Sequence, residues 1–369
     1  MKYLDEYRDP QAARKLLDEI RRRTTRQWTL MEVCGGQTHG LLRYGIESEL
    51  DGVIELIHGP GCPVCVTPLE AIDFAQQLAL RGDVLLTSFG DMLRVPGSQQ
   101  SLLETQAAGG RIRIVYSPLD AVELARRHPD TEVVFFAVGF ETTAPATALA
   151  VKHAFRDGID NFSLLVSHVR VLPAMELLAQ SPQNRVQAFL AAGHVCTITG
   201  YESYYDFADR FQLPVVVTGF EPLDLLEGIL AAVTQLESGR SCVENCYSRS
   251  VRSEGNLIAQ DIVREMYEVC DRPWRGFGTV PQGGLQLRDE WSQFDAAKRF
   301  NMNLSLPVID DARCRSADVL AGRIKPTACE EFDRDCTPDR PLGAPMVSSE
   351  GACAAYYRYR NPQQVTSGG

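Results

Sequence analysis

The chain has 369 residues, 44% of them hydrophobic, and a net charge of −11, which is ordinary for a globular protein large enough for more than one domain. The acidic balance argues against nucleic acid as a partner, because a protein that binds the phosphate backbone needs a basic face. No stretch approaches the roughly 18 apolar residues of a membrane span. The charged start MKYLDEYRDP lacks a signal-peptide core, so we expect a cytoplasmic protein with no membrane partner.

The first 60 residues predict a helix followed by two strands. Residues 10–23, PQAARKLLDEIRRR, have apolar side chains at helical spacing, and Asp9 is placed to cap this helix. WTLMEV (28–33) and GVIELI (52–57) are short apolar runs of strand length. We therefore expect residues 1–27 to form an N-terminal helical segment that precedes the first sheet.

Strands and helices continue to alternate up to about residue 240. The apolar runs are DVLLTSF, RIRIVYS, EVVFFAVGF, FSLLVSHV and LPVVVTGF, and helical patterns follow several of them. Continuous apolar strands alternating with helices indicate parallel sheets covered on both faces. VVFFAVGFETT and PVVVTGFEPLD form a weak repeat, so we predict two related α/β domains, at residues 28–120 and 121–240.

The pattern changes after residue 240. Residues 248–271 have one long helical pattern, and the rest is rich in Pro and Cys with few periodic runs. We assign residues 241–369 to a helical and loop-rich C-terminal domain. A segment with so little regular structure needs something other than an apolar core to hold it.

Four of the cysteines lie in this tail and predict a metal centre. They are separated by 15, 7 and 17 residues, which does not fit a zinc ribbon with paired CxxC knuckles. The ligands of an iron–sulfur cluster converge from separate loops, so the spacing favours a [4Fe–4S] cluster. A zinc site and four unrelated thiols are the competing interpretations. These four tail thiols are Cys314, Cys329, Cys336 and Cys353.

A second set of thiols follows the first two predicted strands. Cys34 ends the first strand, and Cys62 and Cys65 follow the second in GPGCPVC. If these strands are neighbours in a parallel sheet, their carboxyl ends share one edge and the three thiols meet there. The TPLE sequence that follows predicts a capping box with Thr67 as N-cap, which would place Cys65 just ahead of a helix N-terminus that favours a thiolate.

The chemistry of this set stays open at the level of the residues. The CPVC pair can close a disulfide, clamp a metal from one side, or consist of passive loop thiols. With Cys34 it could hold one iron at a glycine-lined edge, with an open position for a partner's ligand. His39 and His58 flank the thiols, and each is more typical of a hydrogen-bonding scaffold than of a ligand. Structural roles are expected for the remaining thiols, Cys196, Cys242, Cys246 and Cys270.

Six motifs in order resemble those of the hydrogenase formation protein HypD family: MEVCGGQTHG, HGPGCPVCVTP, GDMLRVPGS, FFAVGFETTAPATA, TGFEPLDLL and PLGAPMVSSEGACAAYY. The resemblance implies a maturation factor for [NiFe] hydrogenases. With a small HypC-type chaperone, such a protein holds the iron on which the Fe(CN)2CO group, with its cyanide and carbon monoxide ligands, is assembled. It also implies a HypE-type cyanide donor as a partner and the hydrogenase large subunit as an indirect one.

The resemblance implies roles for individual residues. Cys34 would be the thiolate that contacts the iron, and Cys62 and Cys65 would be a redox-active pair beside it. His39 is retained from the family's first motif and joins this catalytic group. The four tail thiols would bind a [4Fe–4S] cluster in a C-terminal iron–sulfur domain. Beyond the resemblance, our hypothesis is that this cluster feeds electrons to the CPVC pair.

Two positions depart from the family pattern. Gln37 stands where the family often has His, and a glutamine can form hydrogen bonds but cannot carry a proton. Asp333 stands where the family usually has Gly, which concerns the conformation of its loop and not the set of ligands.

A second function remains open from the sequence. In this alternative the chain is a thiol–disulfide oxidoreductase whose Cys62 and Cys65 act on protein substrates, with an iron–sulfur or zinc tail. The sequence does not decide between a catalyst and a scaffold.

Overall fold

The computed structural model describes residues 5–301 and 310–359, so parts of the expected segments 1–27 and 241–369 lie outside the described residues. No helix in the described ranges is long and apolar enough to cross a membrane. The strands are β1 (Trp28–Glu32), β2 (Ile54–His58), β3 (Val84–Ser88), β4 (Ile112–Ile114), β5 (Glu132–Gly139), β6 (Phe162–His168), β7 (Ala188–Ala192), β8 (Val215–Thr218), β9 (Val243–Asn245), β10 (Tyr267–Trp274) and β11 (Gly278–Leu287). The helices are α1 (Pro10–Arg23), α2 (Gly35–Arg43), α3 (Ile46–Glu49), α4 (Leu69–Ala79), α5 (Leu102–Ala107), α6 (Pro118–Arg127), α7 (Ala144–Arg156), α8 (Val171–Gln180), α9 (Gly193–Thr199), α10 (Ser203–Phe211), α11 (Pro222–Glu237), α12 (Leu257–Met266), α13 (Ala296–Arg299), α14 (Ser316–Leu320) and α15 (Ala352–Tyr359).

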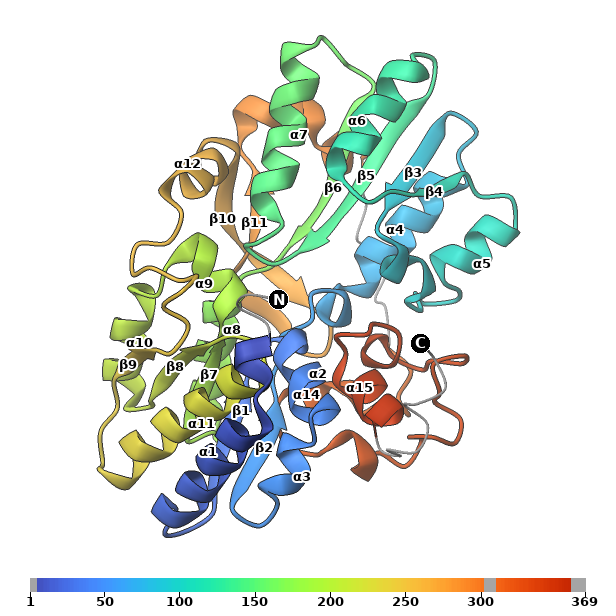
Figure 1. Ribbon diagram of the computed structural model, residues 1–369. Helices are drawn as coiled ribbons and strands as arrows, with labels where there is room; N and C mark the ends of the chain where they lie inside the picture. Colours follow the sequence, from blue (N-terminus) through green and yellow to red (C-terminus); the bar gives the residue numbers. More distant parts are fainter. Residues whose placement is uncertain (1–4, 302–309, 360–369) are drawn as a thin grey trace.

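Two parallel sheets and one antiparallel pair make up the described strands. The five-stranded sheet has the order β2-β1-β7-β8-β9, and the four-stranded sheet has the order β4-β3-β5-β6. Figure 1 shows the four-stranded sheet in the upper part of the molecule and the five-stranded sheet in the lower part. The predicted α/β class with parallel sheets is confirmed, and the antiparallel β10–β11 pair is an addition to it.

Both faces of the five-stranded sheet are covered by helices. Leu30 of β1 belongs to a core that includes Ile20 of α1 and Leu225 of α11. Its neighbour Met31 points to the other face and belongs to a core that includes Phe207 of α10. The central strand β7 is buried along its whole length, and its sequence AFLAA is a continuous apolar run, as expected for a strand covered on both faces.

The four-stranded sheet follows the same rule. Phe135 of β5 packs in a core with Val151 of α7 and Leu285 of β11, whereas Phe136 packs on the other face with Ile72 of α4. The antiparallel pair therefore helps to cover this sheet.

The strands of each sheet do not come from one continuous segment. β1 and β2 pair in the same sheet as β7–β9, whereas β3–β6 form the other sheet, so the expected segment 28–120 contributes strands to both. The sequence repeat marks similar strand–turn–helix units, but the choice of neighbouring strands depends on contacts distant in the sequence. Where independent folding units begin and end stays a prediction.

The predicted helix over residues 248–271 is wrong in part. α12 covers only Leu257–Met266, and β10 begins at the next residue. Tyr267 and Trp274 at the ends of β10 are buried, and β10 pairs with β11 in antiparallel register. Pairing with a strand further along the chain overrides the local helical pattern. The helix predicted at the N-terminus is confirmed as α1, with Asp9 as its N-cap.

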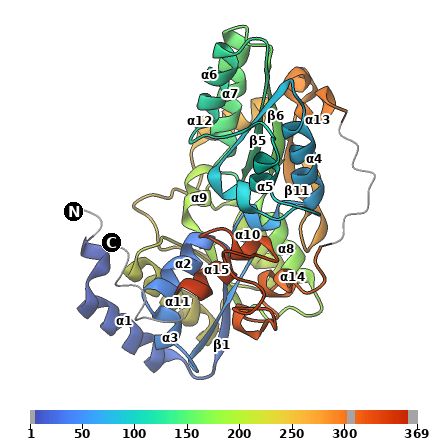
Figure 2. The same ribbon diagram turned by 90° about the vertical axis from the view of Figure 1, so that its right-hand side faces the viewer.

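The described part of the tail is rich in loops and ends in α15. This helix contacts α2, and Figures 1 and 2 both show it beside α2. The tail thus lies against α2, the helix that follows β1.

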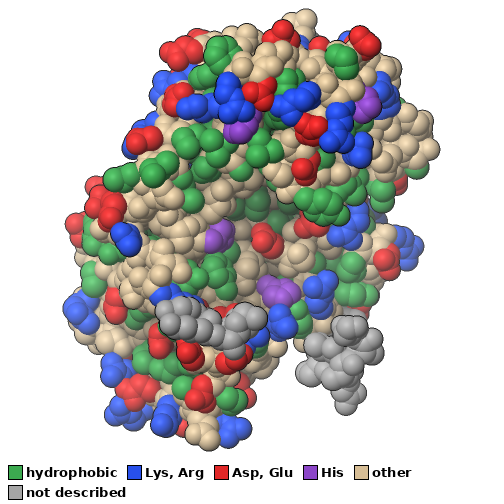
Figure 3. All heavy atoms as spheres, turned by 45° about the horizontal axis from the view of Figure 1, so that its top comes forward, with side chains coloured by type: hydrophobic (Ala, Val, Ile, Leu, Met, Phe, Trp, Pro, Cys, Tyr) green, Lys and Arg blue, Asp and Glu red, His purple; other side chains and the backbone are tan. Residues whose placement is uncertain are grey.

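The face shown in Figure 3 has Lys and Arg side chains interspersed with Asp and Glu.

We expect Leu30→Ala to lower the free energy of unfolding by about 2–5 kcal/mol, because it leaves a cavity in a fully buried part of β1 between β2 and β7. Urea unfolding measures the change. Leu80→Ala is the control, since Leu80 is 55% exposed at the end of α4, and it should cost less than about 0.5 kcal/mol. Equal losses in the two variants would contradict the assigned core.

Candidate thiol and metal sites

Cys34 and the CPVC segment lie side by side at the carboxyl ends of β1 and β2. These strands pair in parallel, with Glu32 opposite His58 at the end of the register, so the condition under which the two loops meet is fulfilled. The Gly35 N–H donates to the Gly61 carbonyl at 3.0 Å. A Cβ on Gly61 would lie 2.4 Å from the Cys34 Cα, so this close approach requires glycine.

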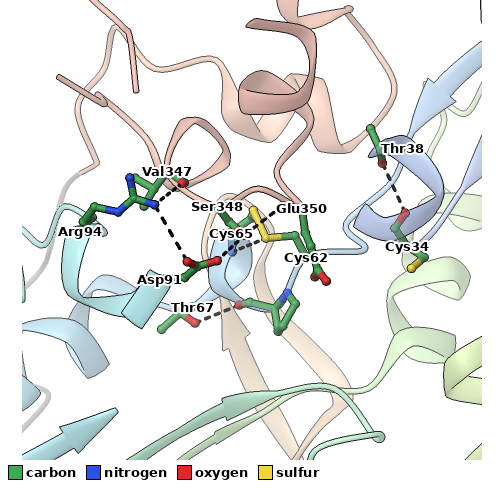
Figure 4. Close-up of a disulfide and its surroundings, with 11 residues drawn as sticks. Cys34, Thr38, Cys62, Cys65, Thr67, Asp91, Arg94, Val347, Ser348 and Glu350 are labelled. Carbon is green, nitrogen blue, oxygen red and sulfur yellow. Dashed lines mark hydrogen bonds and ion pairs between the residues drawn. A yellow bond between two sulfur atoms is a disulfide. The ribbon is translucent and has the colours of Figure 1, made fainter. Parts of the chain in front are cut away.

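Cys62 and Cys65 form a disulfide at this edge (Figure 4). Their Cα atoms are 5.3 Å apart, and neither residue is more than 2% exposed. The Cys65 N–H also donates to the Cys62 Sγ at 3.2 Å. Of the three states that the sequence left open for this pair, the structure has the disulfide. All the other cysteines are free thiols, and Cys196 is buried in the same core.

The capping box expected at Thr67 is wrong. Pro68 is the N-cap of α4, and the Thr67 hydroxyl donates to the Pro63 carbonyl at 2.9 Å. A 3-10 turn at Val64–Val66 separates the disulfide from the helix and occupies the threonine side chain. Cys65 therefore lies within that turn and not directly ahead of the helix N-terminus.

Among the described residues, His194 makes a side-chain hydrogen-bond contact with the Cys34 sulfur. The Cys34 Sγ and the His194 Nδ1 are 3.5 Å apart. Burial raises the pKa of the Cys34 thiol, and it lowers the pKa of His194 to about 4. His194 follows β7, the neighbour of β1, in the sequence AFLAAGH, so its place after a strand end was a signal that could have identified it.

A buried carboxylate, Glu32, joins the loops of this edge. Its Oε2 accepts the Cys34 N–H at 3.0 Å, and its Oε1 accepts the Thr38 hydroxyl at 2.5 Å. The same Oε1 lies 2.6 Å from the Nδ1 of His58. Burial raises the pKa of Glu32, and the hydrogen bonds from its partners act in the opposite direction. His58 is therefore a hydrogen-bonding scaffold residue here, as the sequence favoured.

The network continues into the C-terminal helix. The His58 Nε2 lies 2.9 Å from the Tyr356 hydroxyl, which donates to Glu47 at 2.6 Å. Lys325 donates to the same Glu47 oxygen at 2.5 Å. Glu32, Glu47 and Tyr356 escaped the sequence analysis, because their partners come from distant parts of the chain.

The two polar residues of the first motif have different partners. Gln37 is fully buried, and its Nε2 donates to the Ala191 and Thr218 carbonyls at 3.1 and 3.4 Å, which ties α2 to the ends of β7 and β8. Its Oε1 has no hydrogen-bond partner among the described residues. The His39 Nε2 lies 2.9 Å from the Tyr359 hydroxyl, and burial lowers the pKa of His39. His39 thus contacts α15, and its catalytic role stays a prediction.

The four tail thiols line one pocket. Within the described ranges, no three His, Cys, Asp or Glu side chains stand close enough to hold a single metal ion. A cluster of several irons is wider than one ion, so four thiols around an apolar pocket fit the donor set of a [4Fe–4S] cluster. The pocket is lined by Cys314, Cys329, Cys336 and Cys353, with Val319, Phe332, Leu342 and Met346 among the apolar residues.

The loop at Asp333 keeps the conformation that glycine favours. Asp333 has a φ of 61°, in the left-handed region, and its N–H donates to the Cys336 carbonyl at 3.1 Å. Aspartate adopts this region more readily than most residues do. The departure from the family pattern at this position is therefore compatible with the turn that carries Cys336.

The stretch from Val347 to Glu350, just before α15, lies beside the Cys62–Cys65 disulfide. The Ser348 hydroxyl donates to Asp91 at 3.3 Å, and Arg94 donates to the Val347 carbonyl at 3.1 Å. A Cβ on Gly35 would lie 2.2 Å from the Glu350 carbonyl oxygen. Figure 4 shows Ser348 and Glu350 beside the disulfide, with Cys34 to one side. This short stretch of chain thus lies beside the CPVC disulfide and leads directly to Cys353 of the tail pocket.

Comparison with known proteins identifies the family. Residues 11–360 match the profile of HypD, described as the hydrogenase formation hypA family. The chain belongs to the HypD family. Hydrogenase maturation factor HypD of Rhodobacter capsulatus is 44% identical over 372 residues, covering 97% of this chain and 98% of the relative. HypD of Escherichia coli K12 is 43% identical over 371 residues, covering 98% and 99%. HypD2 of Bradyrhizobium diazoefficiens is 46% identical over 377 residues, covering 99% of both. This member of the HypD family is a hydrogenase maturation factor.

We expect Tyr356→Phe to lower the free energy of unfolding by about 1–3 kcal/mol, because the change removes the partner of His58 and a donor to Glu47 in a buried network. Urea unfolding measures the loss. Tyr116→Phe is the matched control, since Tyr116 is 92% exposed, and it should leave stability unchanged. If the Tyr356→Phe variant has the same free energy of unfolding as the wild type, the network does not hold α15 in place.

Proposed function

We propose that this HypD family member and a HypC-type chaperone together form the scaffold on which the Fe(CN)2CO group is assembled. The observation that carries the proposal is that the buried Cys34 and the buried Cys62–Cys65 disulfide lie at one edge of the sheet, on loops joined by the hydrogen bond from the Gly35 N–H to the Gly61 carbonyl. In this proposal a HypE-type partner supplies cyanide, and the hydrogenase large subunit receives the finished group. We place this work in the cytoplasm.

Iron is the substrate in this proposal, and Cys34 is the residue that holds it. Soft thiolates suit an iron that carries cyanide and carbon monoxide. Since burial raises the pKa of the Cys34 thiol, the free thiol is protonated at neutral pH, and iron binding displaces the proton to solvent. Gly36 is the glycine next to this sulfur, since a Cβ on it would lie 3.6 Å from the Cys34 Sγ, and the lack of a side chain there leaves room beside the thiol.

The CPVC pair is the redox element of the proposal. Opening the disulfide takes up two electrons and two protons and yields the Cys62 and Cys65 thiols next to Cys34. The four tail thiols would hold a [4Fe–4S] cluster, which would supply electrons one at a time. Ser348 and Glu350 of the tail lie beside this disulfide, and the bonds of Val347 and Ser348 to Arg94 and Asp91 hold the tail near it.

The alternative, a thiol–disulfide oxidoreductase, is less well supported by the geometry. A thiolate of a protein substrate must reach a disulfide sulfur to exchange with it. Cys62 and Cys65 are 2% and 1% exposed, so the protein surface offers no direct path for such an attack. Turnover of a generic protein disulfide without any partner would nevertheless favour the alternative.

Anaerobic co-purification with the HypC-type chaperone tests the proposal. Infrared spectra of the complex should show cyanide and carbonyl stretching bands. Cys34→Ala should abolish these bands, because the change removes the ligand of the iron, and should leave the visible absorption of the cluster intact. Cys242→Ala, which removes an exposed thiol, is the control and should keep both signals. Bands that persist in Cys34→Ala would overturn the role of Cys34.

Metal analysis tests the tail. The chain purified without oxygen should be brown and hold about four irons in the tail pocket. Cys336→Ala should lower the iron content and the visible absorption, because it removes one of the four thiols of this pocket. A colourless protein with one zinc would contradict the cluster and favour a structural metal.

A further inference from the structure

His194 lies against the Cys34 sulfur in a position set by tight backbone packing. A Cβ on the preceding Gly193 would lie 2.5 Å from the Thr218 carbonyl oxygen and 2.6 Å from the Tyr247 ring, so the start of α9 is pressed against the end of β8. The His194 ring also packs on Phe220, with ring centres 5.4 Å apart. The 3.5 Å approach of Nδ1 to the Cys34 Sγ is therefore held by the fold.

The ring nitrogen of His194 that faces the sulfur is Nδ1. A histidine ring nitrogen that carries a proton is a hydrogen-bond donor. Which ring nitrogen carries the proton depends on the hydrogen bonds that the ring makes. A sulfur that holds iron has no proton of its own and can only accept, so it favours the proton on Nδ1.

We propose that His194 is a positioning residue for the Cys34 sulfur, and that its imidazole donates the Nδ1–H to this sulfur once the sulfur holds iron. The inference rests on the proposed function and goes beyond it, since it concerns how the held iron is tuned. In the loading step the S–H bond of Cys34 breaks and a bond between sulfur and iron forms. The thiol proton leaves to solvent, His194 keeps its Nδ1 proton, and no electron is transferred.

This hydrogen bond has a measurable consequence. A donor aimed at a metal-bound sulfur draws electron density from it and tunes the metal. The iron then returns less density to its cyanide and carbonyl ligands, and their stretching frequencies rise. Loss of the donor should therefore move both sets of bands to lower frequency.

Three proteins test the proposal: wild type, His194→Leu and His194→Asn, each isolated with the HypC-type chaperone. His194→Leu keeps an apolar bulk but has no donor, so its carbonyl and cyanide bands should shift by a few wavenumbers to lower frequency. The Asn side-chain N–H can reach the place of Nδ1, so His194→Asn should restore the wild-type bands. Identical bands in all three proteins, or equal shifts in both variants, would overturn the proposal.

A second measurement covers the case in which His194→Leu does not fold. In wild-type protein with 15N-labelled histidine, long-range NMR correlations show which ring nitrogen carries the proton. A proton on Nδ1 in the iron-loaded complex supports the proposal, and a proton on Nε2 alone overturns it. Bands that persist in Cys34→Ala would overturn the proposed function, whereas unshifted bands in His194→Leu beside a normal wild type overturn this inference alone.

Discussion

The arrangement of the thiol edge depends on one buried carboxylate. Glu32 has no exposed surface, and it accepts the Cys34 N–H and the Thr38 hydroxyl while contacting His58. A buried charged group is costly unless it is fully hydrogen-bonded, so these partners are held in a narrow range of positions. The ends of β1 and β2 and the start of α2 are thereby locked together, and the contact of His58 with Tyr356 extends the constraint to the tail.

The path of the chain places the disulfide at a crossing between the two sheets. β2 ends in the five-stranded sheet, the CPVC turn follows, and α4 and β3 belong to the four-stranded sheet. The chain returns through α8 to β7, which pairs with β1 on the side opposite β2. His194 at the end of β7 therefore arrives beside Cys34 through strand pairing, although 160 positions separate the two residues. The proposed iron site is in this sense a property of the sheet and not of one motif.

The tail connects its own thiols to this edge. Cys336 and Cys353, at the two ends of one stretch of the tail, both line the tail pocket. Ser348 and Glu350, between these two cysteines, lie beside the Cys62–Cys65 disulfide. The contacts of this stretch with Arg94 and Asp91 come from the loop after β3, and those with Gly35 come from α2. A loop-rich segment is held here by polar contacts to the loop after β3 and by close packing against α2.

The amino-acid sequence by itself determined the α/β class and the family, because apolar periodicity and motifs are local features. It brought Cys34 to the CPVC turn only on the condition that β1 and β2 are neighbours, and the structure shows that they are. The tertiary structure alone decided that β3–β6 form a separate sheet inserted between β2 and β7, that residues 267–287 form a hairpin and that Thr67 does not cap α4. It also decided which side chains join the thiol edge: Glu32 and Tyr356 have no signature of their own in a single sequence, and the place of His194 after a strand end does not show that it meets Cys34. Their roles come from contacts between residues far apart in the chain, and such contacts exist only once the sheets and the tail have packed together.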